Sequence, residues 1–386
     1  MRVCVIAKAC PADFTSSDAI YHVPLSIARR DELVLISTKS VKGRSLGEAL
    51  TEEIVVPAGR FWSWKVFKEL KRGHFAKRIK CVLTGIDESS MLAGLLAQTF
   101  LGIRWIAVCE DHPYQTRYHE ASFAKRIERW GRTWVLRLIL RFPQRVVFFI
   151  HPGVLDFLWI AERKKALLRN SADLEVIGPI RERWEKEQEQ KHKQDCGEPV
   201  VSYIGLINET KGGVYMLDVF RQVLAKRPDA RLKLIGRIEQ GFEERLMDLI
   251  KEYAIEKNVE LTGLLSAEDA LRAALESTVC IHAYQPLPWL YWNQVLKICE
   301  YFALGKAVVS VDYPGTRDLI EDEKNGLLVP YGESEKMADA VLKVIEDGEL
   351  RERIERGALK RASALSWDET EKKLFKIIDE CAGERN

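Results

Sequence analysis

Residues 292–311, WNQVLKICEYFALGKAVVSV, join a helix to a strand with charges at only a few positions. The apolar side chains of Val295, Ile298 and Phe302 recur at helical spacing, and Gly305 is placed to end the helix. The run AVVSV that follows is short, apolar and rich in β-branched residues, which favours a buried strand. This stretch therefore predicts one helix and one strand of an α/β sheet.

Lys297 and Glu300 lie three residues apart near the start of this predicted helix, so they share one face. The N-terminus of a helix attracts phosphate through free backbone N–H groups. A carboxylate one or two turns along the helix can accept hydrogen bonds from both hydroxyls of a ribose. The stretch therefore predicts a nucleotide site in outline.

Length and composition favour a protein of two domains. The chain has 386 residues and 47% hydrophobic content, enough for two separate cores. No apolar run approaches the roughly 18 residues of a membrane span, and the start, MRVCVIAKAC, is typical of a first strand rather than a signal peptide. The eight cysteines form no CxxC pair, which favours reduced thiols. We expect a cytoplasmic protein.

The charges are divided unevenly along the chain. Residues 1–150 hold 24 Lys and Arg against 14 Asp and Glu, whereas the remaining residues carry more acidic than basic side chains. Residues 61–80 and 123–142 interleave cations with aromatic and aliphatic residues, a pattern that suits the surface of an anionic membrane. The alternative is that the apolar faces pack on a sheet and only the charges are exposed. No nucleic-acid module is recognisable, so we expect no nucleic-acid partner.

Both halves alternate apolar runs with stretches long enough for crossover helices, which predicts parallel sheets covered on both faces. Ligands of such sheets bind at the carboxyl ends of the strands. The expected strands are RVCVIA, LVLIST, EEIVVP, CVLTG, WIAVC and VVFFI in the first half, and VVSYIG, RLKLIG, VELTG, TVCIHA, AVVSV and GLLVP in the second.

A charged segment separates the two halves. The sequence GPIRERWEKEQEQKHKQDCGEP has almost no aliphatic residues after its first turn and ends in a Gly-Glu-Pro turn. We therefore expect a first domain at 1–180, a charged linker at 181–198 and a second domain at 199–365. The amphipathic segment 366–386 is expected to form a final helix.

The second domain carries the motifs. In YIGLINETKGG, Gly205 ends a predicted strand, and Lys211 and Gly212 precede a predicted helix. Glycines there let the backbone approach a ligand, and a lysine at that edge supplies a point charge for phosphate. The runs LIGR, LTG, CEYFALGKAVVS, YPGTRDLI and NGLLVP follow in order.

This order and spacing resemble the nucleotide-binding domain of the family 4 glycosyltransferases over residues 199–365. Members of that family are retaining enzymes of the GT-B fold, in which two Rossmann-like α/β domains face a cleft. The resemblance implies the same fold here, with the C-terminal helix crossing back to pack on the first domain. The first half resembles the family's acceptor domain only loosely.

The resemblance also implies roles for particular residues. Lys211 would contact the diphosphate of a nucleotide-sugar, and Glu300 would accept the ribose hydroxyls. The distal phosphate would lie near the helix N-terminus, and the strand ends would line the base and ribose. The implied donor-binding residues are Gly205, Lys211, Gly212, Gly236, Arg237, Gly263, Gln294, Val295, Leu296, Lys297 and Glu300. Because these groups can neutralise a diphosphate, no metal or cofactor is required, and no Asp-x-Asp motif argues for one.

The sequence departs from the family pattern at two positions. Many members have a second glutamate, which reaches the transferred sugar, where this chain has Trp292. Many also have an arginine directly after the glycine of the first strand of this domain, where this chain has Leu206. An indole cannot accept the hydrogen bonds of a carboxylate, so these positions bear on the donor sugar and on activity.

The candidate chemistry of the first domain lies in CEDHP, directly after the strand WIAV. Asp111 and His112 are the predicted catalytic residues there, together with Lys211 of the second domain, because catalytic groups sit at the carboxyl ends of parallel strands. The alternative is a turn in which an aspartate caps the chain before Pro113. His282 shows no ligand spacing to another histidine, so we assign it no role.

The sequence thus favours a retaining, metal-independent glycosyltransferase. It would move a sugar from a nucleotide-sugar to an acceptor hydroxyl on a glycan, a lipid or a small molecule, and it could lie peripherally on the inner face of a membrane. Two alternatives remain open, a GT-B nucleotide-sugar epimerase and a catalytically degenerate GT-B binding module.

Overall fold

The computed structural model describes residues 1–8, 19–41, 46, 49–59, 61–110, 123–151, 153, 156, 159–190 and 198–383. The chain divides into two compact units. The first unit comprises residues 1–170 and 367–386, and the second comprises residues 171–366.

The first unit is built on a parallel sheet with the strand order β3-β2-β1-β4-β5-β6-β7. All the strands expected in this half are present, and the structure adds β7, which is too short to give an apolar run in the sequence. The strands are β1 (Arg2–Ala7), β2 (Glu32–Ser37), β3 (Glu52–Val55), β4 (Cys81–Gly85), β5 (Arg104–Cys109), β6 (Arg145–Phe148) and β7 (Lys165–Leu167).

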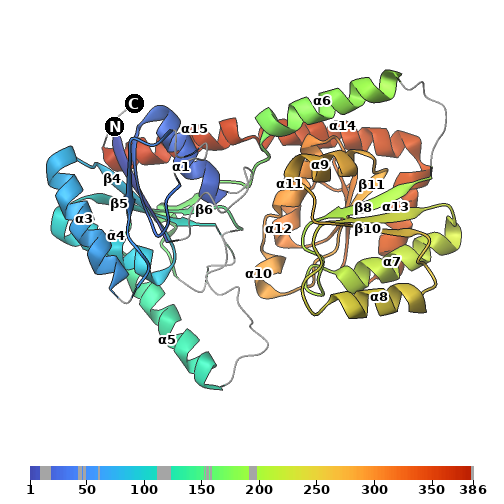
Figure 1. The fold of residues 1–386 in the computed structure, drawn as a ribbon, viewed down its shortest axis with the longest axis horizontal. Helices are drawn as coiled ribbons and strands as arrows, with labels where there is room; N and C mark the ends of the chain where they lie inside the picture. The colour runs from blue at the N-terminus through green and yellow to red at the C-terminus, as the bar shows by residue number, and fades with distance from the viewer. Residues whose placement is uncertain are drawn as a thin grey trace. The chain divides into compact units, whose positions relative to one another are not determined.

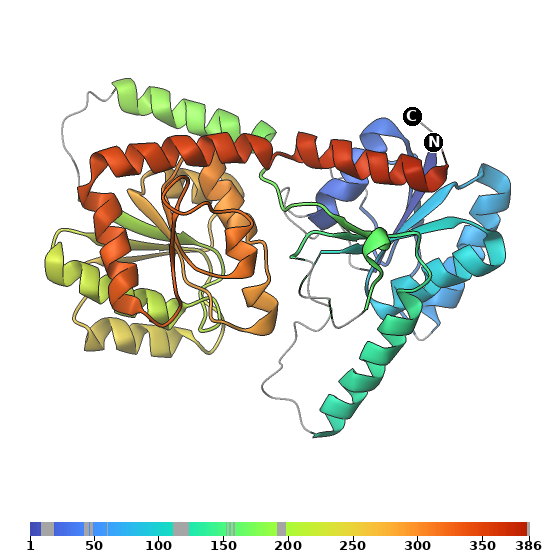
Figure 2. The same ribbon diagram turned by 180° about the vertical axis from the view of Figure 1, so that it is seen from behind.

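Helices cover both faces of this sheet, as Figures 1 and 2 show. Alternate strand residues pack on α1 and α15 in one core cluster, while Trp105 packs against Gly94 of α4 on the other face. The final helix therefore packs on the first sheet, as expected. The helices are α1 (Ala19–Arg30), α3 (Trp62–Lys77), α4 (Glu88–Leu101), α5 (Phe123–Ile139), the 3-10 helix η3 (Glu162–Lys164) and α15 (Trp367–Ala382).

The second unit holds a parallel sheet with the strand order β10-β9-β8-β11-β12-β13, and every strand expected in this half is found. Apolar strand residues and the helices on both faces form its core (Figure 1). The strands are β8 (Val200–Ile204), β9 (Arg231–Ile235), β10 (Val259–Gly263), β11 (Val279–His282), β12 (Val308–Val311) and β13 (Leu327–Val329).

Helices connect and flank these strands. They are α6 (Leu174–Gln190), α7 (Gly213–Lys226), α8 (Glu243–Glu252), α9 (Ala267–Leu275), α10 (Pro288–Tyr291), α11 (Leu296–Ala303), α12 (Pro314–Arg317), α13 (Ser334–Glu346) and α14 (Gly348–Ala364). In the part of the chain that the structure describes, no helix of either unit is both long and apolar enough to cross a membrane.

The first part of the segment expected to be a linker, 181–198, is helical because it continues α6. Glu, Lys, Gln and Arg are good helix formers, and a helix on the surface needs only a narrow apolar stripe to pack. Ile180 is buried in the core of the second unit, and Arg272 of α9 donates a hydrogen bond to Glu187 at 2.7 Å. The prediction of a linker, which rested on the charged composition of this segment, was therefore wrong for the residues that belong to α6.

Candidate functional site

The strand order of the second sheet changes direction at β8. The chain proceeds from β8 outward through β9 and β10, then returns to the other side of β8 with β11. In parallel sheets, the loops that follow two such neighbouring strands leave a crevice at the carboxyl edge, where ligands bind. Gly205, Lys211 and Gly212 follow β8, and Tyr284 follows β11, so these residues meet at this point.

Asn208 organises the loop between β8 and α7. Its side-chain oxygen accepts hydrogen bonds from the backbone N–H of Lys211 at 2.7 Å and from the hydroxyl of Thr210 at 3.1 Å. Its backbone carbonyl accepts a bond from the N–H of Gly213 at 2.8 Å. This single buried side chain therefore fixes the backbone that carries Lys211. The sequence analysis assigned Asn208 no role, although Asn is a residue that commonly bonds to the backbone two or three positions ahead.

Gly212 brings the loop against the end of β11. Its φ of +83° is left-handed, and a Cβ added there would lie 1.9 Å from the carbonyl oxygen of Ala283. Only glycine fits both restraints. The loop is therefore pressed onto the neighbouring strand end.

The ammonium group of Lys211 lies over the ring of Tyr284, 4.1 Å from the ring centroid. Tyr284 is buried, and its carbonyl accepts a hydrogen bond from the hydroxyl of Tyr313 at 2.8 Å. The ring face attracts the cation, which restricts the position of the ammonium group. The structure thus places a positive charge at the carboxyl edge, where the sequence predicted one.

His282 lies beneath this pair. Its ring is 4.2 Å from that of Tyr284, and its Nδ1 is 2.9 Å from the hydroxyl of Ser310. Burial, followed by the charge of Lys211, lowers the pKa of His282 to about 3, so the ring is neutral near pH 7. Its buried Nε2 has no hydrogen-bond partner among the described residues. The position of His282 at the end of a predicted strand is the sequence feature that points to this site, whereas its spacing from other histidines does not.

Lys297 and Glu300 lie on one face of α11, as their spacing predicted, and they form an ion pair there. The ammonium of Lys297 is 2.8 Å from Oε2 of Glu300. Glu300 is only 5% exposed, so its carboxylate is largely removed from water. Its other oxygen, Oε1, accepts no hydrogen bond from the residues that the structure describes, which leaves it available to a ligand hydroxyl.

The segment that leads into α11 is anchored by its side chains. Gln294 is fully buried and donates a hydrogen bond from Nε2 to Asp318 at 2.9 Å. Val295 is the N-cap residue and makes no side-chain cap, and the helix starts at Leu296. The amino end of α11 therefore carries no side-chain cap of its own, which is compatible with the predicted binding of phosphate by backbone N–H groups.

The ends of β8, β9 and β10 lie close together. A Cβ added to Gly236 would lie 2.1 Å from the carbonyl oxygen of Gly205, and Gly236 bridges Gly263. The carbonyl of Arg237 accepts a hydrogen bond from the N–H of Ile207 at 2.9 Å, while its side chain is exposed. These residues thus line the carboxyl edge. Their predicted contacts with base and ribose remain predictions.

The two positions that depart from the family pattern have structural settings of their own. Trp292 follows α10, and its ring lies edge-on to that of Tyr291, 5.4 Å between centroids. The backbone there is tightly packed, because a Cβ on Gly315 would lie 2.2 Å from the carbonyl oxygen of Asn293. Leu206 accepts a hydrogen bond from the hydroxyl of Tyr203 through its backbone carbonyl at 3.1 Å.

The predicted catalytic residues of the first unit, Asp111 and His112, lie outside the described residues. β5, which precedes them, ends at Cys109 as expected. Their assignment therefore stays a prediction.

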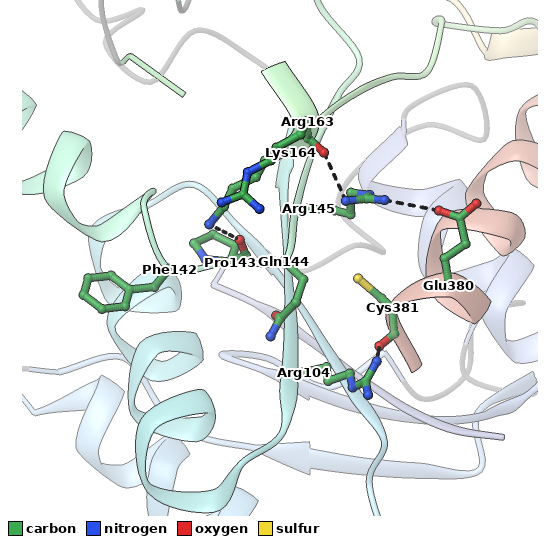
Figure 3. A pocket seen from close by; sticks show the side chains of 9 residues that line it. All are labelled: Arg104, Phe142, Pro143, Gln144, Arg145, Arg163, Lys164, Glu380 and Cys381. Carbon is green, nitrogen blue, oxygen red and sulfur yellow. Dashed lines mark hydrogen bonds and ion pairs between the residues drawn. The ribbon is translucent and has the colours of Figure 1, made fainter. Parts of the chain in front are cut away.

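A pocket of about 500 Å³ in the first unit lies at the opposite edge of its sheet (Figure 3). Arg104 and Arg145 begin β5 and β6, so the pocket opens at the amino ends of the strands. Arg104 donates a hydrogen bond to the carbonyl of Cys381 at 2.5 Å, and Arg145 pairs with Glu380 at 3.3 Å. These contacts attach the end of α15 to the sheet. We therefore interpret the pocket as a gap at this attachment rather than as the substrate site.

Replacing Gly212 with alanine should be far more harmful than replacing Gly263. Both glycines have positive φ, which costs alanine about 1–2 kcal/mol, but only Gly212 faces a backbone carbonyl, whereas an added Cβ at Gly263 meets open space. Urea unfolding should show Gly212→Ala losing at least about 1 kcal/mol more stability than Gly263→Ala, since overpacking typically costs 1–3 kcal/mol. Equal losses would contradict the close packing of this loop.

His282 should make the second unit less stable in mild acid. Because the folded pKa is about 3, the unfolded chain binds a proton below about pH 6.5 that the folded chain does not. This contribution is fully present above about pH 6.5 and falls by about 2 kcal/mol by pH 5. The free energy of unfolding, measured above pH 6.5 and at pH 5, should change less between these pH values in His282→Gln than in the wild-type protein. The same pH dependence in both proteins would exclude a neutral buried His282.

Part of the second unit is similar to known proteins. The family model for glycosyl transferases group 1 matches residues 185–361. Alpha-D-kanosaminyltransferase of Streptomyces kanamyceticus is 29% identical over 160 residues, which are 42% of this chain and 40% of that protein. Phosphatidyl-myo-inositol mannosyltransferase of Mycolicibacterium smegmatis is 25% identical over 184 residues, 47% of this chain and 45% of that protein. The chain thus spans less than half the length of these curated relatives.

Solved structures match almost the whole chain, at low identity. A glycosyltransferase from Rickettsia africae has a TM-score of 0.76 at 14% identity and covers 98% of both chains. Anabaena Alr3699/HepE, crystallised in complex with UDP, has a TM-score of 0.77 at 16% identity and covers 98% of this chain and 100% of that one. These likenesses establish the predicted GT-B fold. The family match confirms the resemblance drawn from the sequence: residues 185–361 are similar to the glycosyl transferases group 1.

Proposed function

We propose that this chain is a glycosyltransferase that moves a sugar from a nucleotide-sugar to an acceptor hydroxyl. The observation that carries the proposal is that one sheet carries two groups of opposite charge near its carboxyl edge. They are the ammonium of Lys211 and the buried carboxylate of Glu300. Lys211 rests on Tyr284, and Glu300 is buried with one oxygen available. A nucleotide-sugar needs both groups, one for its diphosphate and one for its ribose.

In this proposal the second unit stabilises the leaving group. Lys211 and the amino end of α11 meet the negative charge that develops on the diphosphate as the sugar departs. Glu300 accepts hydrogen bonds from the ribose hydroxyls, while its other oxygen keeps the bond to Lys297. Gly236, Arg237 and Gly263 line the base and ribose. Because these groups supply the positive charge, the proposed transfer requires no metal.

The proposed outcome is retention of the anomeric configuration. In a front-face route, the acceptor oxygen forms its bond to the anomeric carbon on the side from which the diphosphate leaves. The leaving phosphate takes the acceptor's proton, so no covalent glycosyl-enzyme intermediate is needed. Asp111 and His112 are proposed to act on the side of the acceptor.

A catalytically degenerate binding module is the second candidate, and Trp292 and Leu206 favour it. Both replace residues that many members use, and neither side chain can supply the charge of the residue it replaces. Binding of a nucleotide-sugar without turnover on any acceptor would support the module. Conversion of a nucleotide-sugar with no acceptor present would instead indicate an epimerase.

The variant Glu300→Gln should no longer bind a nucleotide with ribose hydroxyls more tightly than a nucleotide that lacks them. A hydrogen bond to a charged group contributes about 1.5–3 kcal/mol, so wild-type protein should bind UDP at least about tenfold more tightly than 2′,3′-dideoxy-UDP. Titration calorimetry of Glu300→Gln should show this ratio falling toward one. UDP is the first probe, followed by GDP and ADP.

The comparison is internal to each protein, so a general loss of stability in the variant does not imitate the result. An unchanged ratio in Glu300→Gln would remove Glu300 from the ribose. Binding of none of the three nucleotides by the wild-type protein would overturn both the transferase and the epimerase.

A further inference from the structure

One end of the first unit exposes a cluster of large apolar side chains. Trp130, Trp134 and Leu138 lie along α5, 66%, 44% and 60% exposed, and Trp159 is 62% exposed. The rings are contiguous, with centroids 5.9 Å apart for Trp130 and Trp134 and 6.0 Å apart for Trp134 and Trp159. We call these four residues the α5 aromatic surface. Large contiguous apolar patches on soluble proteins mark sites where a protein or a membrane binds.

The opposite side of α5 is used for packing. Leu136, Ile139 and Leu140 are buried within the unit, while α5 extends outward from the sheet in Figure 1. The helix is therefore amphipathic in an unusual way, with one apolar face inside the unit and a second one exposed. The expectation that the apolar face simply packs on the sheet accounts for only part of this helix.

The exposed rings are held in place rather than loosely displayed. The guanidinium of Arg137 lies 4.8 Å from the ring centroid of Trp134 and 4.4 Å from that of Trp159. Trp159 also has a φ of +52°, in the left-handed region that bulky residues rarely adopt. Such strain persists where the surroundings impose it, and it is often kept at sites of binding. Here it directs a tryptophan toward solvent, beside an arginine.

Cations accompany the rings. The α5 sequence FAKRIERWGRTWVLRLI has five basic residues and one acidic residue, and the exposed Arg141 follows its end. The acidic residue, Glu128, pairs with Arg132, which also pairs with Glu88. The surface is thus apolar and cationic together. Tryptophan rings prefer the headgroup level of a bilayer, and arginines there meet lipid phosphates.

We propose that the α5 aromatic surface docks this protein on an anionic phospholipid bilayer. Trp130, Trp134 and Trp159 enter the headgroup layer, and Arg137 and Arg141 contact phosphates. The helix lies in the interface and does not cross it. This docking does not depend on the proposed transfer reaction, and it assigns a location to the peripheral association predicted from the sequence.

The test is sedimentation of the full chain with vesicles of phosphatidylcholine alone or mixed with phosphatidylglycerol. The wild-type protein should sediment with the mixed vesicles and remain in solution with the neutral ones. Trp159→Gly should bind the mixed vesicles at least about fivefold more weakly, yet its thermal midpoint should stay close to that of wild type, because glycine relieves the left-handed backbone. Trp130→Ser combined with Trp134→Ser should bind at least about tenfold more weakly.

Leu264→Ser is the matched control, since Leu264 is 80% exposed in the second unit, and its vesicle binding should equal that of wild type. Three results would overturn the proposal. They are no binding of wild type to the mixed vesicles, equal binding to neutral vesicles, and full binding by the tryptophan variants. A dimer that these variants abolish, without vesicle binding by wild type, would assign the surface to a second copy of the chain instead.

Discussion

The close packing of the loop after β8 against the end of β11 is the constraint on which the candidate site depends. Gly212 allows the approach to Ala283, and Asn208 fixes the backbone on either side of Lys211. With this approach, Lys211 can rest on Tyr284, the residue after Ala283. The position of the Lys211 ammonium at the edge of the sheet thus depends on the lack of a side chain at Gly212.

The buried groups around this contact divide into charged and neutral ones. His282 stays neutral because burial and the charge of Lys211 both oppose a second cation there. Burial and the charge of Glu300 likewise raise the pKa of Cys299 to about 12, so that thiol stays protonated. Lys211, the exposed Arg237 and the ion pair of Lys297 with Glu300 are charged groups of this site, which suits a ligand that carries both phosphates and hydroxyls.

Local pattern predicted most of the fold and part of the site. The apolar runs predicted the strands, and the spacing of Lys297 and Glu300 predicted that they share a helix face, because both features depend on residues close in sequence. The roles of Tyr284 and His282 depend on the pairing of β11 with β8. The sequence does not show this pairing, because Tyr284 and Lys211 are far apart along the chain. The exposure of the aromatic rings of α5 could not be predicted either, because a hydrophobic pattern does not show whether the side chains face the core or the solvent. The charged second half of α6 was mistaken for a linker for a similar reason.

The most direct test of the central claim is the turnover of Lys211→Ala with a donor that the protein is found to bind. The account holds that Lys211 meets charge that develops only as the diphosphate leaves, so kcat should fall by more than about tenfold. Lys226→Ala is the control, because Lys226 is an exposed lysine of the same unit that pairs with Asp339, and its kcat should match that of wild type. An unchanged kcat in Lys211→Ala would contradict the account.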